Sequence, residues 1–134
     1  MRTYNIFISH SWTYGDAHDL LIKFFDREPY FDYKNYSVPK DDPIHNAPYD
    51  WQLEEAIERQ IKPCSAIVIM AGKYATFSKW IKKEIVIAKR LGKPIIAVKP
   101  WANTQVSDVV RENADVLVGW NGSSIVNTIK ERAL

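Results

Sequence analysis

Short runs of consecutive apolar residues alternate along the sequence with stretches in which apolar residues recur every three or four positions. The runs predict strands at 4–9, 66–71, 94–98 and 115–119, with a further short strand near 36–38. The periodic stretches predict amphipathic helices at 16–27, 50–61, 76–91, 106–113 and 123–132. Strand and helix therefore alternate throughout. This order predicts an α/β domain of three layers around a five-stranded parallel sheet.

The periodicity also predicts which helical side chains face the sheet. In the helix at 16–27 these are Leu20, Leu21, Phe24 and Phe25. The helix at 76–91 is expected to stop at Gly92, because glycine readily adopts the left-handed conformation that often ends a helix.

One charged residue interrupts the apolar stripe of the helix at 76–91. Glu84 lies in the middle of that stripe, and its neighbours one turn away are Trp80, Ile81, Ile87 and Ala88. None of them can neutralise a carboxylate from the same helix. Two interpretations stay open at this point. The carboxylate either has a structural partner elsewhere in the fold or is kept for chemistry.

Length and composition indicate one ordinary globular domain. The 134 residues are 46% hydrophobic and 25% charged, and the net charge of +2 gives no sign of a nucleic-acid partner. Cys64 is the only cysteine, so an internal disulfide is excluded, which is compatible with a reducing cytosol. Because the sequence shows neither a signal peptide nor a membrane-spanning apolar run, we expect a cytoplasmic protein without a membrane partner.

Several familiar kinds of site are disfavoured. No glycine-rich phosphate loop follows a predicted strand. Ser9, His10 and Asp16 contain the residue types of a hydrolytic triad, but no nucleophile elbow accompanies them. A phospho-receiver domain needs an acidic pair after the first strand and an aspartate ending the third, where this sequence has Ala71 and Gly72.

A long loop with three prolines, at 39–48, is a candidate functional segment. Its Asp41, Asp42 and His45 are of metal-ligating types, but Asp-Asp-Pro is also ordinary turn chemistry, and we expect no metal site. In parallel sheets, ligands bind beyond the carboxyl ends of the strands, where the strand order switches. This rule places residues 9–11, the 39–48 loop and the start of the Glu84 helix around one crevice.

Two segments resemble sequence boxes of TIR domains. Residues 4–11 (YNIFISHS) resemble the first-strand box, and residues 78–84 (SKWIKKE) resemble the S-x-W-C-x-x-E box, with Ile81 at the usual cysteine position. The sequence is most similar to the bacterial TIR-like branch that includes the Thoeris anti-phage proteins, in which residues 36–44 and 62–65 also have counterparts. Asn5 replaces the usual aspartate, and the loop after Ser37 differs from that of the animal receptors. These differences argue against an adaptor-receptor role more than against catalysis.

The resemblance implies a single flavodoxin-like domain over residues 1–134, with strand order 2-1-3-4-5. It also implies cleavage of NAD, with Glu84 as the catalytic carboxylate and NAD as substrate rather than cofactor. The product would be a cyclic ADP-ribose-type signal that activates an effector protein, and identical chains would assemble into an oligomer or filament. The substrate-binding residues implied by the resemblance are Phe7, Ser9, His10, Ser37, Lys40, Asp41 and Trp80.

A carboxylate at a ribose has a clear chemical use, because cleavage of a glycosidic bond builds positive charge on the sugar. Two alternatives to an NAD-cleaving enzyme stay open. One is a non-catalytic TIR-type module that works through homotypic assembly and is indifferent to loss of Glu84. The other is an enzyme like the nucleoside deoxyribosyltransferases, which share the architecture and also use a glutamate at the ribose.

Overall fold

The computed structural model of this protein describes residues 2–9, 15–36, 50–70, 79–99 and 108–134, with the backbone alone at 15–18, 50, 53, 70, 79 and 80. Its five strands are β1 (Thr3–Ile8), β2 (Asp32–Asn35), β3 (Ala66–Met70), β4 (Ile95–Val98) and β5 (Val116–Val118). They pair in parallel in the order β2-β1-β3-β4-β5. The flavodoxin-like sheet and the strand order predicted from the sequence are confirmed.

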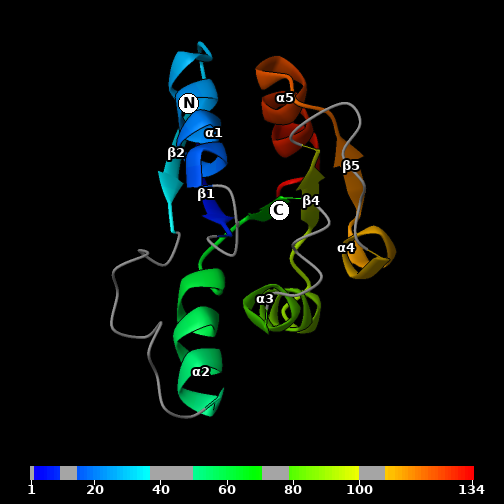
Figure 1. The fold of residues 1–134 in the computed structure, drawn as a ribbon. Helices are drawn as coiled ribbons and strands as arrows, with labels where there is room; N and C mark the ends of the chain where they lie inside the picture. Colours follow the sequence, from blue (N-terminus) through cyan, green and yellow to red (C-terminus); the bar gives the residue numbers. More distant parts are fainter. Residues whose placement is uncertain (1, 10–14, 37–49, 71–78, 100–107) are drawn as a thin grey trace.

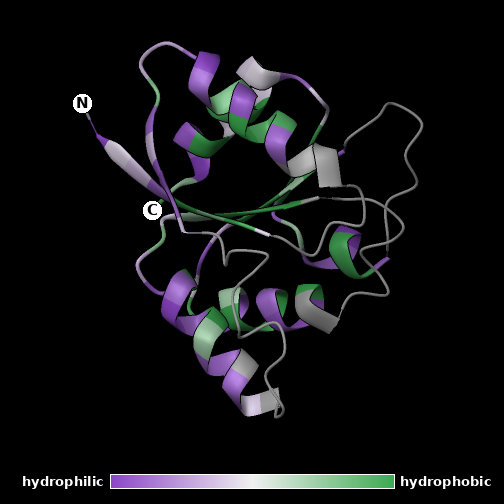
Figure 2. Cartoon of the chain, turned by 60° about the vertical axis from the view of Figure 1, so that its left-hand side comes forward, coloured by the Kyte–Doolittle hydropathy of each residue, from purple (hydrophilic) through white to green (hydrophobic). Residues whose placement is uncertain are grey.

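Helices cover both faces of the sheet (Figure 1). The helices in the described part of the chain are α1 (Gly15–Arg27), α2 (Asp50–Ile61), α3 (Lys79–Arg90), α4 (Asp108–Asn113) and α5 (Gly122–Arg132). Helices α1 and α5 pack on one face, and α2, α3 and α4 pack on the other. Figure 2 shows hydrophobic central strands in the middle layer and helices with both hydrophilic and hydrophobic residues on either side, as expected where the centre of a sheet is buried on both faces.

The central strands form two separate cores because successive side chains point to opposite faces. In β3, Ile67 and Ile69 pack toward α2 and α3, whereas Val68 packs toward α1 and α5. All four residues of β4 are fully buried. An uninterrupted apolar run is what this double burial requires, so these strands were readily predicted from the sequence.

The second strand lies earlier in the chain than predicted. The sequence pattern favoured a strand near 36–38, but β2 covers Asp32–Asn35 and pairs with the first part of β1. The strand is at the edge of the sheet and three of its four residues are exposed, so it lacks an apolar run. Tyr36 still extends the ladder, since its amide donates to the Ile6 carbonyl at 2.9 Å. Positions 37 and 38 lie outside the described residues.

The other predicted elements are confirmed, and their ends differ from the prediction by no more than one residue wherever both are described. The stop of α3 at Gly92 is also confirmed, with φ at 70°. The Gly92 amide donates to the Lys89 carbonyl at 3.1 Å, and the Lys93 amide donates to the Ala88 carbonyl at 2.9 Å. These two bonds form a Schellman motif, which satisfies carbonyl groups at the end of the helix.

The predicted apolar face of α1 is partly wrong. Leu21 and Phe25 are fully buried, and Phe24 is half-buried, but Leu20 is 42% exposed. Leu21 and Phe25 are one helical turn apart and define the buried stripe, so Leu20 lies at its margin. Within the described part of the chain, the structure has no helix that is both long and apolar enough to cross a membrane.

Candidate functional site

Glu84 lies inside the protein, on the side of α3 that packs against the sheet. Its side chain has an exposed fraction of 0%, as do Ile81 and Ala88, one turn away on the same helix. Neither carboxylate oxygen of Glu84 has a partner at full hydrogen-bond geometry among the described residues. The amphipathic pattern of α3 therefore directs a carboxylate into the core rather than toward solvent.

Ser9 is the second buried polar residue among those described, and it directly follows β1. Its amide donates to the Val68 carbonyl at 3.0 Å, which continues the pairing of β1 with β3. Because side chains alternate along the strand, Ser9 lies on the same face as Phe7, the face covered by α2 and α3. The end of β1 thereby meets the Glu84 helix at the point where the strand order switches between β1 and β3.

Burial raises the pKa of the Glu84 carboxyl from its ordinary value of 4.5 to about 8. Loss of hydration is the larger cause, because a charge away from water is costly. The Ser9 side chain acts in the opposite direction and lowers this pKa. The Ser9 contact is weaker than a full hydrogen bond, since neither Glu84 oxygen has a described partner at hydrogen-bond geometry. At neutral pH the resting side chain is therefore mostly the uncharged acid.

The structure brings together three of the residues predicted for the site. Phe7, with an exposed fraction of 1%, belongs to the core between the sheet and α2 and α3, on the same face as Ser9 and Glu84. Trp80 lies in the first turn of α3, one turn before Glu84, and its side chain is outside what the structure describes. The remaining predicted residues, which also lie outside the described part, are His10, Ser37, Lys40 and Asp41.

Tyr36 is a further residue at this edge that the sequence reasoning did not assign to the site. It is half-buried and packs against the core that contains Phe7. It directly follows β2, and the rule that ligands bind beyond the carboxyl ends of parallel strands applies to that position as well. The sequence pattern had predicted the second strand near 36–38, so Tyr36 was expected inside the strand and not directly after its end.

Metal binding has no support in the described part of the chain. No three His, Cys, Asp or Glu side chains described by the structure come together in a way that could hold an ion. The candidates Asp41, Asp42 and His45 lie outside the described residues.

Comparison with protein families shows which family the chain belongs to. Residues 7–105, more than half of the chain, match the family described as Thoeris protein ThsB, TIR-like domain. The chain belongs to the Thoeris ThsB TIR-like domain family. The matched range includes β1 from Phe7 onward and all of α3 with Glu84, so the predicted family is confirmed. The protein is a TIR-type domain of the defence and signalling class.

Solved structures support the TIR-like fold over nearly the whole chain. A conserved protein from Enterococcus faecalis V583 is similar with a TM-score of 0.64 at 13% identity, covering 98% of this chain and 99% of the other. A prokaryotic SEFIR domain is similar with a TM-score of 0.50 at 16% identity, covering 96% and 94%. The comparison with curated proteins gave no match. At these identities the similar structures show the fold alone.

Proposed function

We propose that this TIR-like domain cleaves the bond between nicotinamide and ribose in NAD, with Glu84 as the catalytic residue. The observation that carries the proposal is the placement of Glu84, a buried carboxylate without a full hydrogen bond from any described residue, beside the carboxyl end of β1. Native proteins rarely leave such a group without a partner, and an exception calls for a functional reason. Membership of the ThsB family supports NAD as the substrate class.

The proposed chemistry uses the carboxylate as an electrostatic stabiliser. The bond between ribose C1′ and the nicotinamide nitrogen breaks, and its electron pair moves to the nitrogen, whose positive charge disappears. Positive charge then develops on the ribose, where the ionised form of Glu84 stabilises it. Attack by an adenine nitrogen gives a cyclic product, and attack by water gives ADP-ribose. The cyclic product would be the diffusible signal for an effector protein.

The raised pKa of Glu84 allows substrate binding to change the ionisation state of its carboxyl group. The resting side chain is mostly the uncharged acid at pH 7, because burial disfavours the ion. The nicotinamide ring of NAD carries a positive charge, and an opposite charge nearby lowers the pKa of a carboxyl group. Binding of NAD therefore favours the ionised form that stabilises the transition state.

The complete burial of Glu84 also bears on activation. Since none of its surface is exposed, contact between its carboxylate and a substrate requires neighbouring groups to move. Such an opening agrees with an enzyme that is silent until a trigger or assembly partner acts on it. The same burial also favours the second candidate, a non-catalytic interaction module in which Glu84 is a neutral structural acid.

The test compares Glu84→Gln with wild type after incubation with NAD and the activating partner. We expect nicotinamide release to fall by roughly 10²–10³-fold, the usual effect of removing an electrostatic stabiliser of a transition state. Glu112→Gln, an exposed residue of α4, is the matched control and should keep wild-type activity. Nicotinamide is measured by chromatography, and the nucleotide product is identified by mass spectrometry.

Undiminished nicotinamide release by the folded Glu84→Gln protein would remove Glu84 from the mechanism. If wild type shows no turnover even with its activating partner, the interaction module is the better account. Homotypic assembly that is indifferent to Glu84→Gln would then support that second function.

A further inference from the structure

A hollow at the opposite edge of the sheet from Glu84 has no place in the proposed reaction. Its volume is about 350 Å³, and its walls come from the ends of α3 and α5, the turn before β4 and the residue before β5. Parallel strands all begin at one edge, and this hollow lies there, whereas Ser9 and Glu84 lie where β1 ends. The hollow is therefore separate from the candidate catalytic site.

Three basic side chains from separate parts of the chain line this hollow. Lys89 comes from the last turn of α3, Lys93 from the turn before β4 and Arg132 from the last turn of α5. Within the described part of the chain, no carboxylate forms an ion pair with any of the three. By contrast, Lys83 and Arg90 on the same helix α3 are held by carboxylates of α2, at 2.8 and 2.5 Å.

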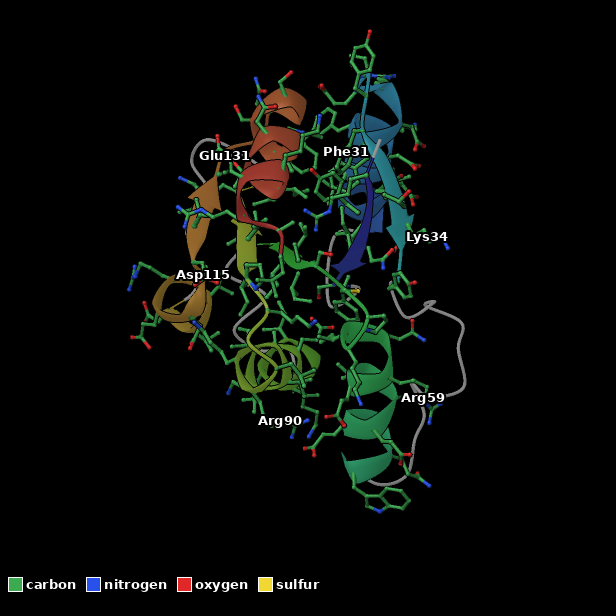
Figure 3. All side chains as sticks on the ribbon, turned by 180° about the vertical axis from the view of Figure 1, so that it is seen from behind. Phe31, Lys34, Arg59, Arg90, Asp115 and Glu131 are labelled. Atoms are coloured by element: carbon green, nitrogen blue, oxygen red, sulfur yellow. The ribbon has the colours of Figure 1, made fainter. Side chains whose placement is uncertain are left out.

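Negative groups in the hollow do not balance these cations. Asp115, labelled at the start of β5 in Figure 3, accepts a hydrogen bond from the Ile95 amide at 2.7 Å, so one of its oxygens is already bound to the backbone. The Leu134 carbonyl oxygen accepts from the Arg2 guanidinium. Even if Leu134 is counted as a second carboxylate, Arg2 adds a fourth cation, and the hollow keeps an excess of positive charge.

Helix dipoles explain only part of this arrangement. A cation in the last turn of a helix interacts favourably with the carbonyl end, which accounts for Lys89 on α3 and Arg132 on α5 taken singly. Lys93 follows the last turn of α3, as the final residue of its Schellman motif, and is outside that explanation. Cations that share one hollow also repel one another, and an anion that binds between them offsets this repulsion.

We propose that this hollow binds the phosphate groups of a small soluble ligand that carries a diphosphate. Ammonium and guanidinium groups form charge-assisted hydrogen bonds to phosphate oxygens, and the planar fork of Arg132 suits two oxygens at once. The volume lies within the range of small-ligand pockets and is sufficient for a diphosphate with part of its ester group. The site acts independently of Glu84.

Inorganic pyrophosphate is the probe, titrated into the isotope-labelled full chain and followed by NMR. We expect saturable shifts in the amides around 89–93 and 132, with a dissociation constant of roughly 1 mM or tighter. Lys93→Gln and Arg132→Gln should each weaken binding about tenfold, since each removes a charge-assisted bond. Lys82→Gln removes an exposed cation of the same helix outside the hollow, and should leave affinity within about twofold.

Three outcomes would overturn the proposal. The first is absence of saturation, and the second is equal weakening by Lys82→Gln and Arg132→Gln, which indicates general surface attraction. The third is binding to vesicles of anionic lipid without any binding of pyrophosphate, which assigns the cations to a membrane surface. Arg132→Lys keeps the charge and guards against a folding artefact, because it should bind more tightly than Arg132→Gln if the site is real.

Discussion

The two faces of the sheet differ in what they bury. The face under α1 and α5 encloses a core in which every fully buried residue described is apolar, with Ile6, Val68 and Ile125 among them. The face under α2, α3 and α4 encloses a similar apolar core but also contains Ser9 and Glu84. One face is therefore built for stability alone, and the other gives up stability to hold a polar pair.

On the face under α1 and α5, the hydroxyl of a tyrosine that packs against the core has a hydrogen-bond partner. Tyr33 packs against Phe25 and Phe31 with ring centroids 5.1 and 5.4 Å away. Its hydroxyl donates to the Asp26 carboxylate at 2.8 Å near the surface. Glu84 has no full hydrogen bond of this kind from any described residue. An unsatisfied buried carboxyl group is costly, so Glu84 lowers the stability of this face, which agrees with the catalytic role proposed for it.

The largest expected effect is a pH-dependent loss of stability that belongs to Glu84. Its pKa is raised by burial to about 8 in the folded protein, against 4.5 ordinarily. The folded state thus holds the proton more tightly. The stabilisation from this group is fully present below pH 4.5 and is lost as pH rises through about 8. Between these values wild type should lose about 1.4 kcal/mol per pH unit relative to Glu84→Gln, on the order of 5 kcal/mol in all.

Urea unfolding of both proteins between pH 4 and pH 9 measures this difference, and the comparison cancels the titration of groups common to both. Glu112→Gln is again the control, because it removes a carboxylate from the exposed surface of α4 and not from the core. If the difference in the free energy of unfolding between wild type and Glu84→Gln stays constant from pH 4 to pH 9, burial does not raise the pKa of Glu84.

A cavity on the other face should cost stability at every pH. Phe25 is fully buried and contacts the rings of Phe31 and Tyr33. Phe25→Ala should lower the free energy of unfolding by about 4 kcal/mol, the usual loss for a buried aromatic side chain. The loss should be the same at pH 5 and pH 8, since no titrating group changes. A loss that varies with pH would mean that the two faces are not independent.

The layered fold could be read from the sequence because its central elements carry strong local patterns. Strands β3 and β4 are continuous apolar runs in the sequence. A glycine, Gly92, follows α3 and has the positive φ that a helix end of this type requires. Strand β2 could not be read in this way. It is a short edge strand of mostly exposed residues, and its pairing with β1 fixes its position instead of an apolar pattern.

The candidate site was only partly predictable for a similar reason. Glu84 could be found because it breaks the helical periodicity of its own segment. Its contact with Ser9 depends on the register of β1 against β3 and on the rotation of α3 over the sheet, and neither is encoded in a local pattern. Tyr36 was not assigned to the site because the position of β2 was predicted wrongly. The family resemblance supplied Phe7 and Trp80, and their roles in substrate binding stay predictions.

The smallest expected effect, Ser9→Ala, separates a positioning role from a packing role. The Ser9 side chain lowers the pKa of Glu84, so it favours the ionised carboxylate. Its removal should cost about 1 kcal/mol of stability, and more at pH 9 than at pH 5, because only the ionised form loses a favourable contact. The midpoint of the pH-dependent loss should also move to higher pH.

Thr128→Ala is the control, because it removes a hydroxyl that donates to the Ser124 carbonyl at 2.7 Å in α5. The stability lost in Thr128→Ala should not vary with pH. Urea unfolding at pH 5 and pH 9 measures the stability lost in each variant. Equal losses for Ser9→Ala at pH 5 and pH 9 would leave Ser9 as a packing residue and Glu84 without a partner at the end of β1.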